Sequence, residues 1–175
     1  MQLLKEAVPN LRRIAVLSNP GNPAQALAVD DLKVAARPLA LQLVPLEARA
    51  PDDFDSAFAA MSRERVEALL VVPEALFILH RTKLADLALK HRLPTMHGVR
   101  ENVDGGGLIS YGPRIADASG RAAAFVDRIL KGARPADLPV EQPTKFELVI
   151  NLKTAKSLGI AIPRSVMLRA DEVVE

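Results

Sequence analysis

Short apolar runs alternate with amphipathic helical stretches along most of the sequence, and this alternation restricts the fold more than any other feature. Four runs have the length and composition of buried strands, at 14–17, 41–46, 68–72 and 93–97. Helical stretches separate them at 23–36, 52–61 and 75–91. Strands that are joined through helices form a parallel sheet with helices on both faces and right-handed crossovers. We therefore predict an α/β fold: one three-layer α/β/α domain with a mainly parallel sheet.

The first helix carries clear start signals. Asn22 can cap it, and Pro23 stands at its first position. We expect its buried face to consist of the following side chains: Leu27, Ala28, Leu32, Ala35 and Ala36. The fourth strand contains Pro94, which restricts it to a strand start or an edge. Between 99 and 104 we expect a short connector with at most one helical turn.

The second half of the chain contains the longest amphipathic pattern. After a short apolar segment at 108–111, apolar side chains recur every three or four residues: Ile115, Ala118, Ala122, Phe125, Val126 and Ile129. Gly132 fits a left-handed C-terminal cap, and Pro135 blocks continuation of the helix. A further strand is expected at 146–150, followed by a short helix at 152–157 that ends at Gly159.

Composition excludes several classes of partner and cofactor. The 175 residues fit one domain, and the net charge of +2 includes no run of five like charges, so nucleic acid is not an expected partner. There is no cysteine, which excludes disulfides and thiolate metal sites. No apolar run reaches the ~20 residues that span a membrane. The first residues form a short amphipathic turn interrupted by Lys5 and Glu6, not a signal peptide, so the chain taken literally stays in the cytoplasm.

Polar side chains gather at the expected strand ends. Ligands of parallel α/β sheets bind at the carboxyl ends of the strands. The candidate ligand-binding residues there are Ser18, Asn19, Asn22, Glu74, His97 and Tyr111.

Each of these candidates also has an ordinary structural interpretation. Loop 18–22 can present amides and helix N–H groups to a carboxylate or phosphate, or simply form a capped turn. Glu74 can hold a ligand ammonium group or complement a helix dipole. His97 can donate to a ligand or cap a loop. Tyr111 can stack on a flat ligand, or it can lock a crossover between lobes.

Motifs for catalysis are missing. Gly105, Gly106 and Gly107 precede a strand and so do not form a dinucleotide fingerprint, and there is no GxxxxGK[ST] loop. Ser110 lacks a GxSxG elbow. His80 and His91 have no Asp or Cys nearby in the sequence that could complete a metal site with them. We therefore expect both to be solvated or half-buried histidines without a metal. We expect no metal, no cofactor and no catalytic residue.

Several runs resemble ABC-transporter substrate-binding proteins of the two-lobed periplasmic type, in the branch associated with tryptophan and tyrosine uptake. They are GGLISYGP at 106–113, the long stretch AAAFVDRILKGARPADLPVEQPTKFELVINLKTAKSLGIAIP at 122–163, and the closing LRADEVVE. RIAVLSNPGNP at 13–23 is similar to the opening of the second lobe in that family. Family members are considerably longer and carry a secretion signal and a first lobe, so the resemblance covers a single lobe of the type I periplasmic binding protein fold.

The resemblance implies a function and partners. It implies that the protein binds a small molecule, such as an amino acid or similar carboxylate, without catalysis. It also implies that the protein lies in the periplasm and delivers this molecule to an ABC permease. The helix within 113–135 would pack on the first lobe. Without that lobe, the apolar face of the helix must pack either on the sheet of its own chain or on a second copy of the chain. We predict a homodimer. Two alternatives remain: the ligand-sensing lobe of a regulator, and a small α/β hydrolase-like enzyme.

Overall fold

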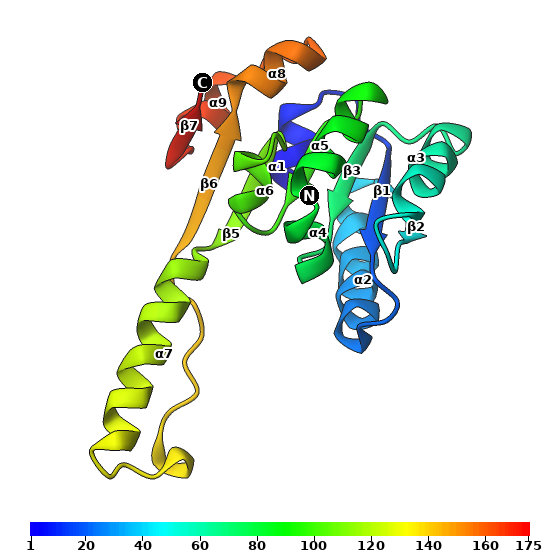
Figure 1. Cartoon of the computed structure of the whole chain (residues 1–175). Coiled ribbons are helices and arrows are strands. Elements are labelled where there is room, and N and C mark those ends of the chain that lie inside the picture. The colour runs from blue at the N-terminus through cyan, green and yellow to red at the C-terminus, as the bar shows by residue number, and fades with distance from the viewer.

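A seven-stranded sheet forms the centre of the computed structural model, which describes residues 1–175 (Figure 1). The strands are β1 Arg13–Ser18, β2 Gln42–Glu47, β3 Ala68–Val71, β4 Thr95–His97, β5 Ile109–Pro113, β6 Phe146–Asn151 and β7 Glu172–Val174. They lie in the order β2-β1-β3-β4-β5-β6-β7, and every neighbouring pair is parallel except β5 and β6. The predicted α/β fold with a mainly parallel sheet is confirmed.

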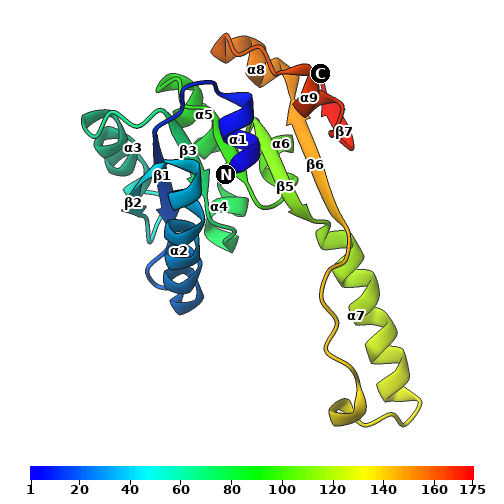
Figure 2. The same cartoon turned by 180° about the vertical axis from the view of Figure 1, so that it is seen from behind.

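Helices cover both faces of this sheet. The helices that cover it are α1 Gln2–Ala7, α2 Pro23–Ala36, α3 Asp53–Arg63, α4 Ala75–Leu79, α5 Arg81–Lys90, α6 Glu101–Asp104, α8 Leu152–Leu158 and α9 Arg164–Met167. Helix α7 Ile115–Leu130 lies apart from the sheet, and 3-10 turns occur at Arg37–Leu39 and Pro135–Asp137. The view of Figure 1 has α3 to α6 in front of the sheet, and the reverse view of Figure 2 has α1 and α2 in front. None of these helices is long and apolar enough to cross a membrane.

The alternation of side chains along each strand builds two separate cores. Ile14 and Val16 of β1 join the core under α1 and α2, whereas Ala15 and Leu17 join the core under α3, α4 and α5. Successive strand residues point to opposite faces, so a continuous apolar run such as β1 is buried on both sides. Of the four apolar strands predicted from the sequence, β1, β3 and β4 are central, whereas β2 lies at the edge of the sheet. Pro94 directly precedes β4.

The predicted start and stop signals act as expected. The Asn22 side chain accepts a hydrogen bond from the Ala24 N–H and caps α2, with Pro23 at its first position. Gly132 and Gly159 follow α7 and α8 with positive φ angles of 99° and 70°. Both glycines lie in the left-handed region that ends helices.

Two details of the helices differ from the expectations. The stretch 75–91 is two helices, because His80 adopts φ −106° and ψ 25° while its ring packs edge-on against Phe54. In α2, Ala36 is buried and Ala28 and Leu32 are half-buried, as expected. Leu27 and Ala35 are exposed, and Gln25 and Val29 are buried in their place. α2 lies over the sheet edge, so only a narrow stripe of the helix meets the core. Helix α9 and strand β7 had no sequence signal strong enough to predict them.

Helix α7 leaves the domain altogether. It extends away from the sheet, and residues 131–145 return beside it to β6 (Figures 1 and 2). None of its sixteen residues is buried. We call residues 114–145 the arm. The arm joins the sheet only through β5 and β6, whose five residue pairs run from Ile109 with Ile150 to Pro113 with Phe146.

Candidate functional site

The carboxyl edge of the sheet, where β1, β3 and β4 end, holds the predicted ligand residues in two loops and three strands. Ser18 is the last residue of β1, Asn19 and Asn22 follow that strand, and Glu74 follows β3. His97 is the last residue of β4, and Tyr111 lies within β5. Because β1, β3, β4 and β5 are neighbours, these residues share one edge of the molecule. The structure does not bring them all into one pocket.

A network of side-chain amides joins two of the loops. Asn22 Nδ2 donates to Glu74 Oε2 at 2.7 Å. Gln25 Nε2 donates to the Pro73 carbonyl at 2.9 Å and to Glu74 Oε2 at 3.3 Å, while Gln25 Oε1 accepts from the Asn19 N–H at 2.9 Å. Asn22 and Glu74 are thus in contact across the edge. The side-chain amides of Asn22 and Gln25 therefore already occupy Glu74 Oε2.

Gln25 is a functional candidate that the sequence did not reveal. It is almost fully buried, and its amide connects the loop after β1 to the loop after β3. A glutamine in the first turn of a helix carries no signal of this role, because glutamine is common on exposed helix faces. Only the packing of α2 against the end of β3 shows it.

Two open grooves flank α2 at this edge. One, of about 440 Å³, includes Ser18 and Asn19 together with Lys33 and Glu47. The other, of about 410 Å³, lies between α2 and β5 and ends at Tyr111. Its apolar lining includes Ala28, Leu32, Leu70, Val72 and Met96. The edge therefore offers a polar surface and an apolar surface within a short distance of each other.

Tyr111 stands where the second groove meets the arm. Its side chain is 47% exposed and stacks on Phe146, with ring centroids 5.7 Å apart. Phe146 begins β6, so the stack links the two strands that carry the arm. This position suits both interpretations of Tyr111, as a ligand contact and as a crossover residue.

His97 points into the interior of the domain. It pairs in register with Val71 and Ser110, so its side chain lies on the face covered by α4 to α6. A Cβ added to Gly107 would lie 2.6 Å from His97 Nε2, which means that the ring fills the space over this glycine. Burial lowers the pKa of His97 to about 3. The ring is neutral at physiological pH.

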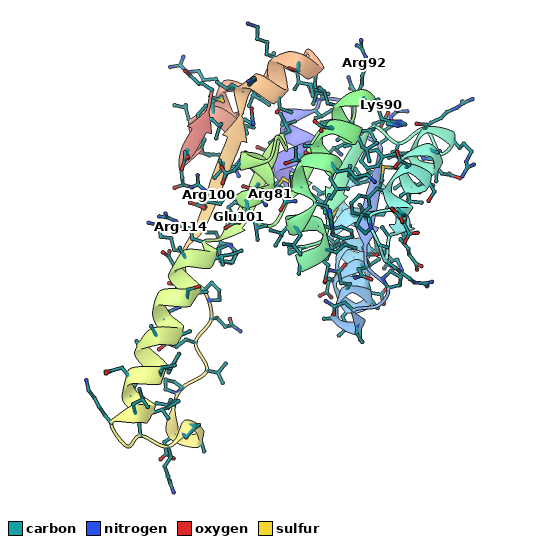
Figure 3. All side chains as sticks on the ribbon, in the orientation of Figure 1. Arg81, Lys90, Arg92, Arg100, Glu101 and Arg114 are labelled. Carbon is teal, nitrogen blue, oxygen red and sulfur yellow. The ribbon has the colours of Figure 1, made fainter.

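An arginine cluster holds the other end of the edge together (Figure 3). Arg100 donates two hydrogen bonds to the carboxylate of Glu172, at 2.8 and 2.9 Å. This bidentate contact raises the pKa of Arg100 and lowers the pKa of Glu172. Arg114 and Arg100 also approach Glu147 Oε2, at 3.5 and 3.9 Å. The cluster ties α6, β6 and β7 to the start of the arm.

The edge shows no arrangement for metal binding or nucleophilic attack. No three His, Cys, Asp or Glu side chains converge closely enough to hold a metal ion. Ser110 is 1% exposed and its hydroxyl makes no hydrogen bond to a base. A side chain in that position is not presented to a substrate.

The doubly covered sheet, with its polar edge and an arm carried by two strands, defines an α/β domain of the periplasmic-binding-protein type. The chain belongs to the ABC transporter substrate binding protein family, whose sequence model matches residues 1–174. No curated protein matches the sequence.

Solved structures support this assignment. A conserved domain protein from Vibrio cholerae O1 biovar El Tor superposes with a TM-score of 0.91 at 28% identity, over 98% of this chain and 58% of that one. An ABC domain from Streptococcus pneumoniae in complex with L-Trp gives 0.91 at 26% identity, over 99% and 58%. CD0873 of Clostridium difficile, a substrate-binding protein with adhesive properties, shares the fold with a TM-score of 0.74 at 20% identity, over 99% and 58%. The chain therefore spans less than two thirds of the length of these relatives.

Proposed function

We propose that this domain binds a small solute, an amino acid or similar compact carboxylate, for an ABC importer, without catalysing a reaction on it. The observation that carries the proposal is the composition of the carboxyl edge. Polar loops joined by the amide network lie beside an apolar groove that ends at a half-exposed tyrosine. A ligand with a charged head and an apolar body fits this combination. Family membership and the L-Trp complex of the pneumococcal relative support it.

We assign the candidate residues different parts in this site. Asn19, Asn22 and Tyr111 are placed to touch the ligand, because the loops after β1 and the end of β5 reach the surface. Ser18 and His97 are buried at the ends of β1 and β4, and we assign them a structural part beneath the ligand-contacting loops. Glu74 holds the loops after β1 and β3 together, because its carboxylate accepts hydrogen bonds from the side-chain amides of Asn22 and Gln25.

The working mechanism that we propose is closure of two lobes about a hinge. Ligand binding favours the closed arrangement only by as much as the closed form binds more tightly. The partner is an ABC permease, and the location is outside the cytoplasm, as is typical of importers of this family. Both belong to the proposal and follow from the family alone.

The arm supplies a contact surface for the rest of such a two-lobed fold. Its helix exposes the apolar side chains Ile115, Val126, Ile129 and Leu130. An exposed apolar stripe marks an interaction surface. We propose that the stripe packs on the part of the longer fold that this chain does not include, and that the isolated chain uses it to form a homodimer.

A size measurement tests the homodimer. The isolated chain is expected to sediment as a dimer at micromolar concentration, and Val126→Lys with Ile129→Lys is expected to make it monomeric, because two charges would then lie in the apolar contact. The control is Lys131→Glu beside the stripe, which should leave the mass unchanged. A monomeric mass of the wild type throughout the micromolar range would refute the dimer.

A thermal-shift screen tests the binding function. L-Trp and other free amino acids are added to the isolated chain, with Tyr111→Ala as the variant. A ligand at ~100 times its dissociation constant adds about 2.7 kcal/mol to the free energy of unfolding, which raises the midpoint by several degrees. The shift should be lost in Tyr111→Ala and kept in Leu168→Ala, a control on the exposed end of α9. No shift with any amino acid or small carboxylate would contradict the proposed function.

A further inference from the structure

Cations without a carboxylate partner gather on the edge of the sheet opposite the candidate ligand site. The connectors that lead from a helix into β1, β2, β3 and β4 all lie at this amino edge, because the four strands are parallel neighbours. Six exposed basic residues stand in these connectors or at the helix ends before them, and none of the six forms an ion pair: Arg12, Arg37, Arg63, Arg65, Lys90 and Arg92. We call this surface the basic edge.

Contacts between the connectors make the basic edge one continuous surface. The Gln42 N–H donates to the Arg12 carbonyl at 2.7 Å, and the Arg12 N–H donates to Glu67 Oε2 at 2.6 Å. Ser62 Oγ at the end of α3 lies 2.9 Å from His91 Nδ1 before β4. The connectors are therefore joined in the order of the strands. Since neighbouring strands are ~4.8 Å apart, the four connectors span roughly 15 Å.

The carboxylates of this edge are engaged within the domain. Glu64 Oε2 accepts a hydrogen bond from Arg13 Nη2 at 2.9 Å. Glu67 Oε2 accepts from the backbone N–H groups of Arg12 and Arg13. The net charge of the whole chain is only +2, so six cations without an ion pair on one edge are a local concentration of positive charge.

Arg65 and Arg92 stand where the backbone favours other residues. They follow α3 and α5 with φ angles of 51° and 55°, in the left-handed region. Glycine and asparagine adopt this conformation with the least strain. One cation near a helix end complements the dipole, and Arg63 and Lys90 already supply it. Figure 3 shows Arg92 extending away from the domain beside Lys90. The additional charges of Arg65 and Arg92 suit a partner outside the domain.

A small anion is not the partner that this edge fits. An open groove of about 680 Å³ lies at the edge and includes Lys5, Arg13 and Glu67 in its lining. These side chains already bond to the Leu39 carbonyl, to Glu64 and to backbone N–H groups. The six cations without an ion pair are instead distributed over four connectors. Such a row matches many negative groups spread over a surface.

A nucleic-acid strand also fits the edge poorly. Proteins that bind single strands stack the bases on aromatic side chains. The exposed aromatic residues of this chain, Tyr111 and Phe146, stack on each other at the base of the arm. The basic edge has only its charges to offer, which is sufficient for a membrane surface.

We propose that the basic edge binds the surface of a bilayer that contains anionic lipids. The inference goes beyond the proposed function and does not depend on it, although an ABC importer also places its partners beside a membrane. Each Lys or Arg near an anionic bilayer strengthens binding roughly fivefold. The arm extends away from the opposite edge (Figure 1), so contact with lipid leaves the arm and the carboxyl edge free.

The test is co-sedimentation of the 175-residue chain with vesicles. The wild type should bind vesicles of equal parts phosphatidylglycerol and phosphatidylcholine, and it should not bind pure phosphatidylcholine. Binding at about 20 mM salt should be lost at about 0.5 M, because salt screens exposed charges. Arg65→Asn with Arg92→Asn should weaken binding by about 25-fold, or roughly fivefold for each cation. Asparagine tolerates the left-handed conformation, so this variant should unfold at the temperature of the wild type.

A matched pair of substitutions removes the same charge elsewhere. Arg121 and Arg128 of α7 form no ion pair, and Arg121→Gln with Arg128→Gln should bind the mixed vesicles as the wild type does. Equal losses in the two double variants, or no loss in Arg65→Asn with Arg92→Asn, overturn the proposal. So does a wild type that ignores the mixed vesicles, or one that prefers single-stranded DNA to them. None of these results touches the solute-binding function, which the L-Trp thermal shift tests separately.

Discussion

Replacement of Gly112 by alanine is expected to destabilise the domain by at least about 3 kcal/mol, the upper end of the range for overpacked sites. A Cβ on Gly112 would lie 1.8 Å from the Gly98 carbonyl oxygen and 2.8 Å from its carbon. Both atoms belong to the backbone at the end of β4, so no side-chain rotation can relieve the overlap. The strands must separate, and the contact between β4 and β5 would be lost near the arm. Urea denaturation followed by circular dichroism measures the change.

Gly120→Ala is the matched control for this substitution. No atom lies within 4 Å of a Cβ at Gly120, in the middle of α7. Alanine favours a helix over glycine by roughly 1 kcal/mol, so this variant should be at least as stable as the wild type. Equal stabilities of Gly112→Ala and Gly120→Ala would show that β4 and β5 do not approach each other as closely as described.

His97 is expected to make the domain sensitive to acid. Its pKa in the folded state is about 3 because of burial, below the ordinary value of 6.5. Above pH 6.5 the ring is neutral in both states and contributes no pH dependence. Between pH 6.5 and 3 the unfolded chain binds a proton that the folded chain does not, so the free energy of unfolding falls as the pH falls. The limiting slope is about 1.4 kcal/mol per pH unit, or roughly 2–3 kcal/mol by pH 4.5.

A variant without the imidazole isolates this contribution. In His97→Leu the free energy of unfolding should fall less between pH 6.5 and 4.5. At pH 7 the variant should lose little stability through hydrogen bonding, because neither ring nitrogen has a partner. His91→Gln, at the surface beside Ser62, should keep the pH dependence of the wild type. Identical pH profiles of the wild type and His97→Leu would mean that the ring is accessible to protons in the folded state.

Local sequence patterns predicted the fold well because each of them acts within a few residues. The apolar run of β1 is buried on both faces, and the Asn22 cap starts α2 as expected. The patterns were less reliable where tertiary contacts decide the outcome. His80 interrupts a helical stretch with a non-helical backbone conformation, and its ring lies edge-on against Phe54, a residue in another helix. Leu27 is apolar yet exposed, because the position of α2 over the sheet edge selects a different stripe.

The candidate site was only partly predictable for the same reason. The rule that ligands bind at carboxyl ends selects the loops after β1, β3 and β4. In the structure the Asn22 and Glu74 side chains from two of these loops are in contact. The rule does not say which side chains are already satisfied. Glu74 is an acidic residue after a central strand, and the sequence gives no means of telling whether its carboxylate has partners within the domain. The hydrogen bonds that Asn22 and Gln25 donate to Glu74 Oε2 show that it does.

The attachment of the arm through two adjacent strands has a mechanical consequence. A helix of sixteen residues is roughly 24 Å long, so a rotation of about 10° at its base moves its tip by ~4 Å. The arm therefore moves as one piece about its attachment at the paired strands β5 and β6. A displacement too small to break the hydrogen bonds between β5 and β6 becomes a displacement of several ångströms at the far end of the arm. A load applied to that end is conversely borne by five residue pairs.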